Sequence, residues 1–191
     1  MVQSPLTLRR WSRVEYDRLA ELGAFEHDAV ELVGGLLIVA EPKGSHHTTA
    51  VGMVEDTLRA ALPPGWIVRT EAPIALDPES APEPDVAVVR GSRADYRDAH
   101  PARPALVIEV AEASLSFDRT EKAGLYARAG IADYWIVNLV DRVVEIHRDP
   151  TPDATAPYGW RYATRQTSRP PAFIAPLDVP TAPIAMTALL P

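Results

Sequence analysis

The stretch Leu106-Val107-Ile108-Glu109-Val110-Ala111 is an apolar run interrupted by a single charged residue. Such a run is typical of a strand that is buried on both faces of a sheet, and it predicts a central strand over Ala105–Ala111. An ionised carboxylate inside such a strand is strongly destabilising unless it is paired with a cation or binds a metal ion. Glu109 therefore needs a positively charged partner.

The sequence that follows this strand predicts a helix and then two further strands. Asp118-x-x-Glu121 has the spacing of a capping box and predicts a helix to about Ala129, which Gly130 ends. Strands are expected over Tyr134–Leu139 and, as its hairpin partner, Val143–Arg148. A tight connection of this kind indicates a crossover between parallel strands in a mixed sheet.

The sequence on either side completes an α/β (α+β) fold, a mixed β-sheet flanked by helices with an N-terminal helix and a β-hairpin. The capping box Ser12-x-x-Glu15 begins the first helix and Gly23 ends it. Gly34-Gly35 supplies the positive φ angles of a two-residue hairpin turn. The other predicted elements are helices from about Arg13 to Leu22 and Ser45 to Leu62, a hairpin over Glu31–Ile38, strands over Ile67–Glu71 and Asp85–Arg90, and an edge strand over Trp160–Thr164.

Length and composition favour one domain over residues 1–191, with a core at about 12–148 and a proline-rich segment, 149–191, that packs on or wraps it. The absence of cysteine excludes a disulfide framework, a thiolate zinc site and a cysteine nucleophile. No apolar run approaches the ~20 residues of a membrane span. We expect a soluble, cytoplasmic protein.

The net charge of −7 differs from the basic surface that proteins binding nucleic-acid phosphates usually present. Among the 19 basic residues, only Lys43 and Lys122 are lysines. Four arginines fall between the predicted strands of Asp85 and Glu109. They are Arg90, Arg93, Arg97 and Arg103. These arginines either contact phosphates beside the site of Asp85 and Glu109 or belong to a solvated loop.

Asp85 and Glu109 are separated by enough chain for one strand, a loop and the return of a neighbouring strand. Adjacent strands lie ~4.8 Å apart, so two inward-facing carboxylates can share one Mg²⁺ ion. Lys122 precedes Leu125 and Tyr126 at helical spacing and therefore lies on the apolar stripe that faces the sheet. Two carboxylates that hold a metal, with a nearby cation, are the groups needed to hydrolyse a phosphodiester.

These residues resemble the PD-(D/E)XK phosphodiesterase superfamily, and within it a group of restriction-endonuclease-like proteins. The resemblance covers about residues 12–148. It rests on Glu31-Leu32-Val33-Gly34-Gly35, Glu83-Pro84-Asp85-Val86, Leu106-Val107-Ile108-Glu109-Val110 and the stretch from Asp118 to Trp135. It implies a restriction-endonuclease-like core in which Asp85 and Glu109 are metal ligands, the carbonyl of Val110 is a further ligand and Glu31 is an accessory acid.

The superfamily's usual lysine lies two residues after the acid, where this chain has Ala111. The resemblance implies that Lys122, on the following helix, is that lysine in a displaced position. The group also tends to follow the acid strand with a Ser-Pro-Ser-like turn, where this chain has Glu112-Ala113-Ser114. Glu112 would either add a metal ligand or repel a phosphate.

Each candidate residue also has a structural interpretation. Asp85 after a proline fits a strand entry, and Lys122 can extend past its apolar neighbours to water. His46 and His47 point about 100° apart on a helix, so they do not chelate one ion together. They act as polar groups at the helix N-terminus, or His47 reaches the site as an accessory residue.

We expect a Mg²⁺- or Mn²⁺-dependent endonuclease that hydrolyses DNA phosphodiester bonds, with Asp85, Glu109, Lys122 and Glu31 in its active site. Because two sites cut a duplex most easily, we also expect a homodimer. The alternative is a non-catalytic module of the same fold that binds DNA or a protein partner, with Glu109 and Lys122 as a structural ion pair. A hydrolase of another substrate class is a third interpretation, which no sugar-binding or acyl-transfer motif supports.

Overall fold

The computed structural model describes residues 8–26, 28–40 and 43–191. A mixed sheet of six strands forms its centre, in the order β3-β4-β5-β6-β7-β8. These strands are β3 (Trp66–Thr70), β4 (Val86–Arg90), β5 (Leu106–Ala111), β6 (Asp133–Asn138), β7 (Val143–Pro152) and β8 (Trp160–Ser168). Strands β5 and β6 run parallel and the other neighbours run antiparallel, which confirms the predicted mixed sheet and its crossover.

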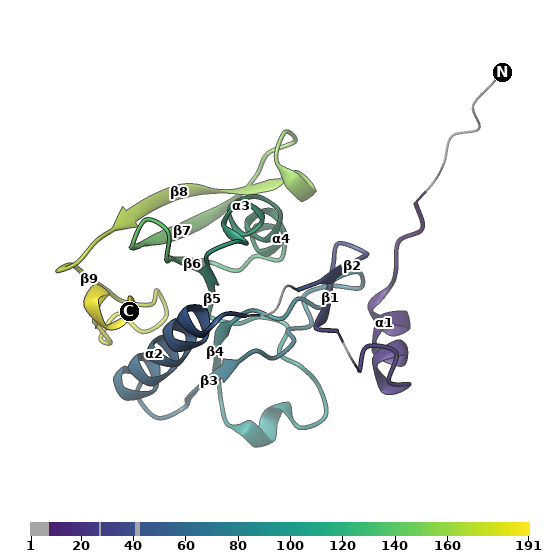
Figure 1. Ribbon diagram of the computed structural model, residues 1–191, viewed down its shortest axis with the longest axis horizontal. Helices are drawn as coiled ribbons and strands as arrows, with labels where there is room; N and C mark the ends of the chain where they lie inside the picture. The colour runs from purple at the N-terminus through teal and green to yellow at the C-terminus, as the bar shows by residue number, and fades with distance from the viewer. Residues whose placement is uncertain (1–7, 27, 41–42) are drawn as a thin grey trace.

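Helices cover both faces of this sheet (Figure 1). The helix α2 (Ser45–Ala61) packs its buried residues against one face, in a cluster that also contains Ile184 and Met186 from the C-terminal segment. The helix α4 (Ala123–Arg128) packs on the other face, where Tyr126 and Ala127 meet Val107. Because side chains alternate along a strand, Glu109 faces α4 together with Val107.

The N-terminal elements form a smaller layer beside the sheet (Figure 1). The helix α1 (Arg13–Glu21) begins at Ser12 with both hydrogen bonds of the predicted capping box. The hairpin β1 (Val30–Val33) and β2 (Leu36–Val39) turns at Gly34-Gly35, where both φ angles are positive as expected. A bridge between Leu32 and Ala81 connects this hairpin to the segment that leads into β4.

The second capping box, Asp118-x-x-Glu121, is an incorrect prediction. The helix begins earlier, with α3 (Leu115–Phe117), and Asp118–Lys122 continues it as a π-helical turn that leads directly into α4. Asp118 has helical backbone angles because it lies inside the helix, so it cannot cap it. Its carboxylate instead accepts a hydrogen bond from the Ser114 hydroxyl at 2.6 Å.

Two strands near the C-terminus are longer than predicted. β7 continues through Pro150 to Pro152, and β8 continues to Ser168. Beyond Arg148, β7 no longer pairs with β6 and pairs with β8 alone. A strand that is unpaired on one side tolerates proline, which has no N–H group to donate. The remaining short elements are β9 (Phe173–Ile174), β10 (Ile184–Ala185) and the 3₁₀ turns Arg93–Tyr96, Pro157–Gly159 and Met186–Ala188.

In the part of the chain that the structure describes, no helix combines the length and the apolar composition needed to cross a membrane.

Candidate functional site

The sheet brings Asp85 and Glu109 together, as their spacing predicts. Asp85 immediately precedes β4, and the antiparallel register pairs the next residue, Val86, with Ile108. The Asp85 N–H donates to Glu109 Oε2 at 3.3 Å, and the Val110 N–H donates to Asp85 Oδ2 at 2.8 Å. Each carboxylate is therefore held by the backbone of the other strand, and both side chains are buried.

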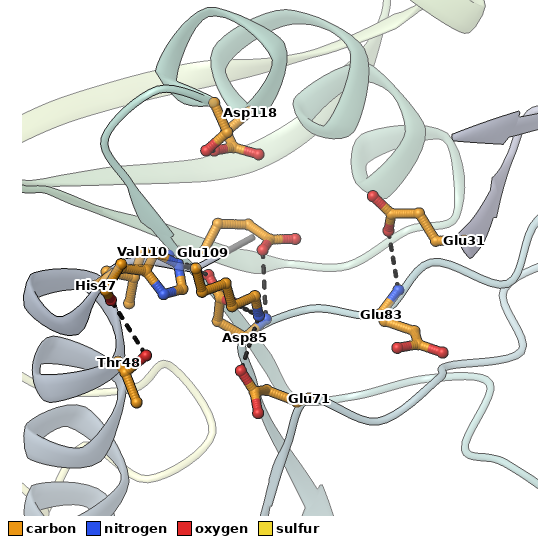
Figure 2. A network of polar contacts seen from close by, with 12 residues as sticks. Glu31, His47, Thr48, Glu71, Glu83, Asp85, Glu109, Val110 and Asp118 are labelled. Carbon is orange, nitrogen blue, oxygen red and sulfur yellow. Dashed lines mark hydrogen bonds and ion pairs between the residues drawn. The ribbon is translucent and has the colours of Figure 1, made fainter. Parts of the chain in front are cut away.

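Lys122 reaches this pair from the π-helical turn. Its Nζ lies 3.0 Å from Glu109 Oε1 and 3.2 Å from Glu31 Oε1. Glu31, on β1, also accepts a hydrogen bond from the Glu83 N–H at 3.0 Å, which anchors the hairpin beside the sheet (Figure 2). Lys122 thus points towards the sheet and does not extend to solvent, and it is 7% exposed.

His47 lies in the first turn of α2 and contacts the same site. Its Nε2 is 3.3 Å from Asp85 Oδ2, while its Nδ1 is buried and has no hydrogen-bond partner among the described residues. Figure 2 shows His47, Asp85 and Glu109 grouped together, with Glu31 and Asp118 on the two sides of the group. His46, by contrast, is directed to Glu112 at 3.7 Å, and both of those side chains are about half exposed.

Three residues of this site are absent from the sequence-based set. The Tyr126 hydroxyl donates to Glu109 Oε1 at 2.7 Å, Lys43 Nζ lies 2.7 Å from Asp85 Oδ1, and Asp118 is buried and faces the same cavity. Asp118 and Tyr126 each lie four residues from Lys122, so helical spacing places all three on one face. The scarcity of lysine is the signal that could have identified Lys43.

A cavity of about 390 Å³ lies among these residues, and its lining includes Lys43, His47, Asp85, Glu109, Asp118 and Lys122. Its walls carry two lysines and the following six carboxylates: Glu31, Glu83, Asp85, Glu109, Glu112 and Asp118. Neither Arg90, at the end of β4, nor the three arginines between β4 and β5 line it, and all four are exposed to solvent. The cavity thus has an excess of negative charge and attracts cations.

Burial and the neighbouring charges shift the pKa values of the carboxylates in this cavity. Burial raises the pKa of Glu109 to about 8 and that of Asp118 to about 6, although Lys122 opposes both shifts. Burial would also raise the pKa of Asp85, but the hydrogen bond from His47 and the charge of Lys43 lower it to about 2.

Lys122 is affected in the opposite direction. Burial alone would lower its pKa, but the negative charges of Glu109, Glu31 and Asp118 raise the pKa above its ordinary value. Lys122 therefore carries a positive charge at neutral pH.

The donor chemistry fits a divalent cation. Carboxylate and carbonyl oxygens are the ligands that Mg²⁺ and Mn²⁺ prefer, and the cavity has more carboxylates than cations to neutralise them. Among the described residues, no three carboxylate or imidazole side chains are placed to share one ion. Asp85 and Glu109 would therefore hold the ion as a pair, with the carbonyl of Val110 and water completing a shell of the kind Mg²⁺ usually keeps.

Comparisons with known proteins support the family and the fold. The family model Uma2, described as "Putative restriction endonuclease", matches residues 13–183. A crystal structure described as a putative nuclease belonging to DUF820, from Anabaena variabilis ATCC 29413, is similar with a TM-score of 0.63 and 14% sequence identity, over 84% of this chain and 88% of that chain. At this identity the likeness supports the fold alone. No match was found among curated proteins.

The family model covers most of the chain, and the similar crystal structure agrees with its fold. The chain therefore belongs to the Uma2 family of restriction-endonuclease-like proteins, within the PD-(D/E)XK superfamily.

Proposed function

We propose that this protein is a divalent-metal-dependent endonuclease that hydrolyses DNA phosphodiester bonds. Asp85, Glu109 and the carbonyl of Val110 would hold Mg²⁺ or Mn²⁺. A bound metal ion of this kind polarises the phosphoryl oxygens and lowers the pKa of a coordinated water. Nuclease-like proteins of this superfamily usually use a divalent metal, which supports the assignment.

The protein's own groups prepare Glu109 for this role. Lys122 and Tyr126 both donate to Oε1, which fixes the orientation of the carboxylate and leaves Oε2 with only the long hydrogen bond from Asp85. Because its pKa is raised, Lys122 keeps its proton and acts as a fixed positive charge. It would stabilise negative charge on the phosphoryl oxygens and would not serve as a base.

The neighbouring acids have separate roles in this proposal. Glu31 holds Lys122 in place through the contact at 3.2 Å. Asp118, whose pKa burial raises to about 6, is the carboxylate best matched to accept a proton from the attacking water near neutral pH. His47 orients Asp85 through its contact with Oδ2.

One observation carries the proposal: a buried lysine reaches Glu109 at 3.0 Å in a cavity that it shares with Asp85, which is the chemistry of a nuclease centre. The test incubates the purified protein with plasmid, linear and branched DNA in Mn²⁺. Asp85→Asn and Glu109→Gln should abolish cleavage. Asp56→Asn, a matched change at an exposed position of α2, should cleave like the wild type. Equal cleavage by wild type and Asp85→Asn would refute the assignment.

A second candidate function is a non-catalytic module that keeps the nuclease fold to bind DNA or a protein partner. The observation that favours it is that both candidate metal ligands already have a lysine partner, with Lys43 on Asp85 and Lys122 on Glu109. Calorimetry separates the two functions. A module of this kind would bind no Mg²⁺ at millimolar concentration, and its melting temperature would not change when Mg²⁺ is added.

A further inference from the structure

Both lysines of this chain lie in one cavity. The sequence has 19 basic residues, and the only two lysines, Lys43 and Lys122, both line the candidate site. The family resemblance gives a role to Lys122 and none to Lys43. The two also differ in exposure, because the side chain of Lys122 is 8% exposed and that of Lys43 is 34% exposed. Lys43 is thus the lysine at the cavity rim, in contact with water.

Lys43 contacts the oxygen of Asp85 that the backbone leaves free. Its Nζ lies 2.7 Å from Asp85 Oδ1 and 2.9 Å from Glu71 Oε1. The other oxygen, Oδ2, already accepts the Val110 N–H and contacts His47. A cation that approaches Asp85 from the cavity therefore competes with Lys43 for Oδ1.

We propose that Lys43 is a substrate-binding residue, which neutralises Asp85 while the site is empty and contacts a phosphate oxygen of the DNA once a divalent cation occupies Oδ1. This inference rests on the proposed function. Lys122 does not make this exchange of partners, because it is buried and held between Glu31 and Glu109 at 3.2 Å and 3.0 Å, and it acts as the fixed charge described above. Lys43 has the exposure to turn from Asp85 to the substrate, and its ammonium is the compact, flexible point charge that suits a phosphate.

The proposal also explains how an acidic cavity can accept an anion. The six carboxylates that line the cavity would repel a phosphate, and the arginines between β4 and β5 lie outside it. A divalent cation on Asp85 and Glu109 would remove part of that repulsion. It would also free the Lys43 ammonium from its ion pair with Asp85, so that it can contact the phosphate. The metal and the substrate are then expected to bind with positive cooperativity.

The first test measures Mg²⁺ binding by calorimetry, which needs no activity. Lys43→Gln removes the competing cation, and we expect it to bind Mg²⁺ about three- to tenfold more tightly than wild type, the effect of one half-exposed ion pair. Lys43→Arg, which keeps the charge, should bind like wild type. Arg59→Gln is the matched control, because it loses an ion pair with Glu55 on α2 outside the cavity.

The second test follows Lys43 directly. Protein labelled with ¹³C at lysine Cε gives two lysine signals by NMR, and Lys43→Arg identifies one of them by its loss. Adding Mg²⁺ should shift the Lys43 signal, and a non-cleavable phosphorothioate oligonucleotide should shift it again. An unmoved Lys43 signal in protein that calorimetry shows to bind Mg²⁺ would overturn the inference.

The third test separates substrate binding from structure. With DNA in Mn²⁺, Lys43→Gln should raise KM about tenfold while kcat changes less than about twofold, and Lys43→Arg should restore KM. A fall in kcat at unchanged KM, or unchanged Mg²⁺ affinity in Lys43→Gln, would overturn the inference and leave the proposed function standing. If the wild type neither binds Mg²⁺ nor cuts DNA, the proposed function fails, and this inference fails with it.

Discussion

Tyr126→Phe tests whether the second hydrogen bond to Glu109 serves metal binding. The change removes the hydroxyl that donates to Glu109 Oε1 at 2.7 Å and leaves the buried ring in place. The Glu109 pKa of about 8 leaves this carboxyl mostly protonated at pH 7, and a hydrogen bond between neutral groups contributes ~0.5–1.5 kcal/mol. Because Lys122 still donates to the same oxygen, we expect a loss of about 1 kcal/mol, which lowers Tm by roughly 2–4 °C in a chain of this size.

The effect on metal binding follows from the acidity of Glu109. Its pKa of about 8 means that a metal ion must displace a proton at pH 7. A lost donor raises the pKa of a carboxylate, and a rise of about one unit would weaken Mg²⁺ binding about tenfold at pH 7 and about twofold at pH 9. Isothermal titration calorimetry at the two pH values measures both effects.

The matched control is Tyr162→Phe. The Tyr162 hydroxyl is also buried, but it donates to the Ile131 carbonyl at 2.8 Å, whereas the Tyr126 hydroxyl donates to Glu109. Its removal should lower stability and leave Mg²⁺ affinity unchanged. If both variants bind Mg²⁺ like the wild type at pH 7, Tyr126 has only a structural role and the reasoning is wrong.

Three further predictions concern pH and packing. Burial raises the pKa of Glu109 from 4.5 to about 8, so the metal-free protein loses stability as pH rises through this range. Mg²⁺ should therefore raise Tm more at pH 8.5 than at pH 6, and an equal rise at the two pH values would contradict this prediction. Burial would raise the pKa of Glu145, but hydrogen bonds from His147 and Arg119 lower it to about 2. Glu145→Gln should therefore lower the free energy of unfolding by about 1 kcal/mol at pH 7. In urea titrations this difference between the variant and the wild type should vanish near pH 2. A Cβ at Gly124 would lie 2.6 Å from the Pro157 carbonyl oxygen, so Gly124→Ala should destabilise by ~1–3 kcal/mol. Gly52→Ala, which meets open space on α2, should stabilise by ~0.5–1 kcal/mol, and the opposite order of melting temperatures would contradict the packing argument.

The sequence patterns predicted the centre of this site because each pattern is local. The apolar run around Glu109 identifies a buried strand, and the spacing of Lys122 to Leu125 and Tyr126 identifies the side of the helix that faces it. Asp85 required one further step, the assumption that two strands joined by a surface loop lie side by side. That assumption holds because β4 and β5 are antiparallel neighbours.

The errors come from context that no short pattern contains. Asp118-x-x-Glu121 has the same spacing as the true capping box at Ser12, but only at Ser12 is the preceding chain extended. The prolines at 150 and 152 suggested that the strand had ended, because the departure of β7 from β6 cannot be read from sequence. Lys43 was missed because its contact with Asp85 joins two irregular segments that are far apart in sequence.

The structure gives a reason for the proposed displacement of the lysine to Lys122. Ala111 lies two residues after Glu109 and therefore points to the same face of the sheet, where it is fully buried against Ala123 and Ala127. A lysine at that position would have to fit beneath α4, in a closely packed part of the core where Ala111 is 0% exposed. Lys122 approaches Glu109 from the start of the same helix, at the side of the cavity. The candidate site is therefore complete only when α4 is packed on β5, so the packing of these two elements and the formation of the Lys122–Glu109 ion pair should be lost together on unfolding.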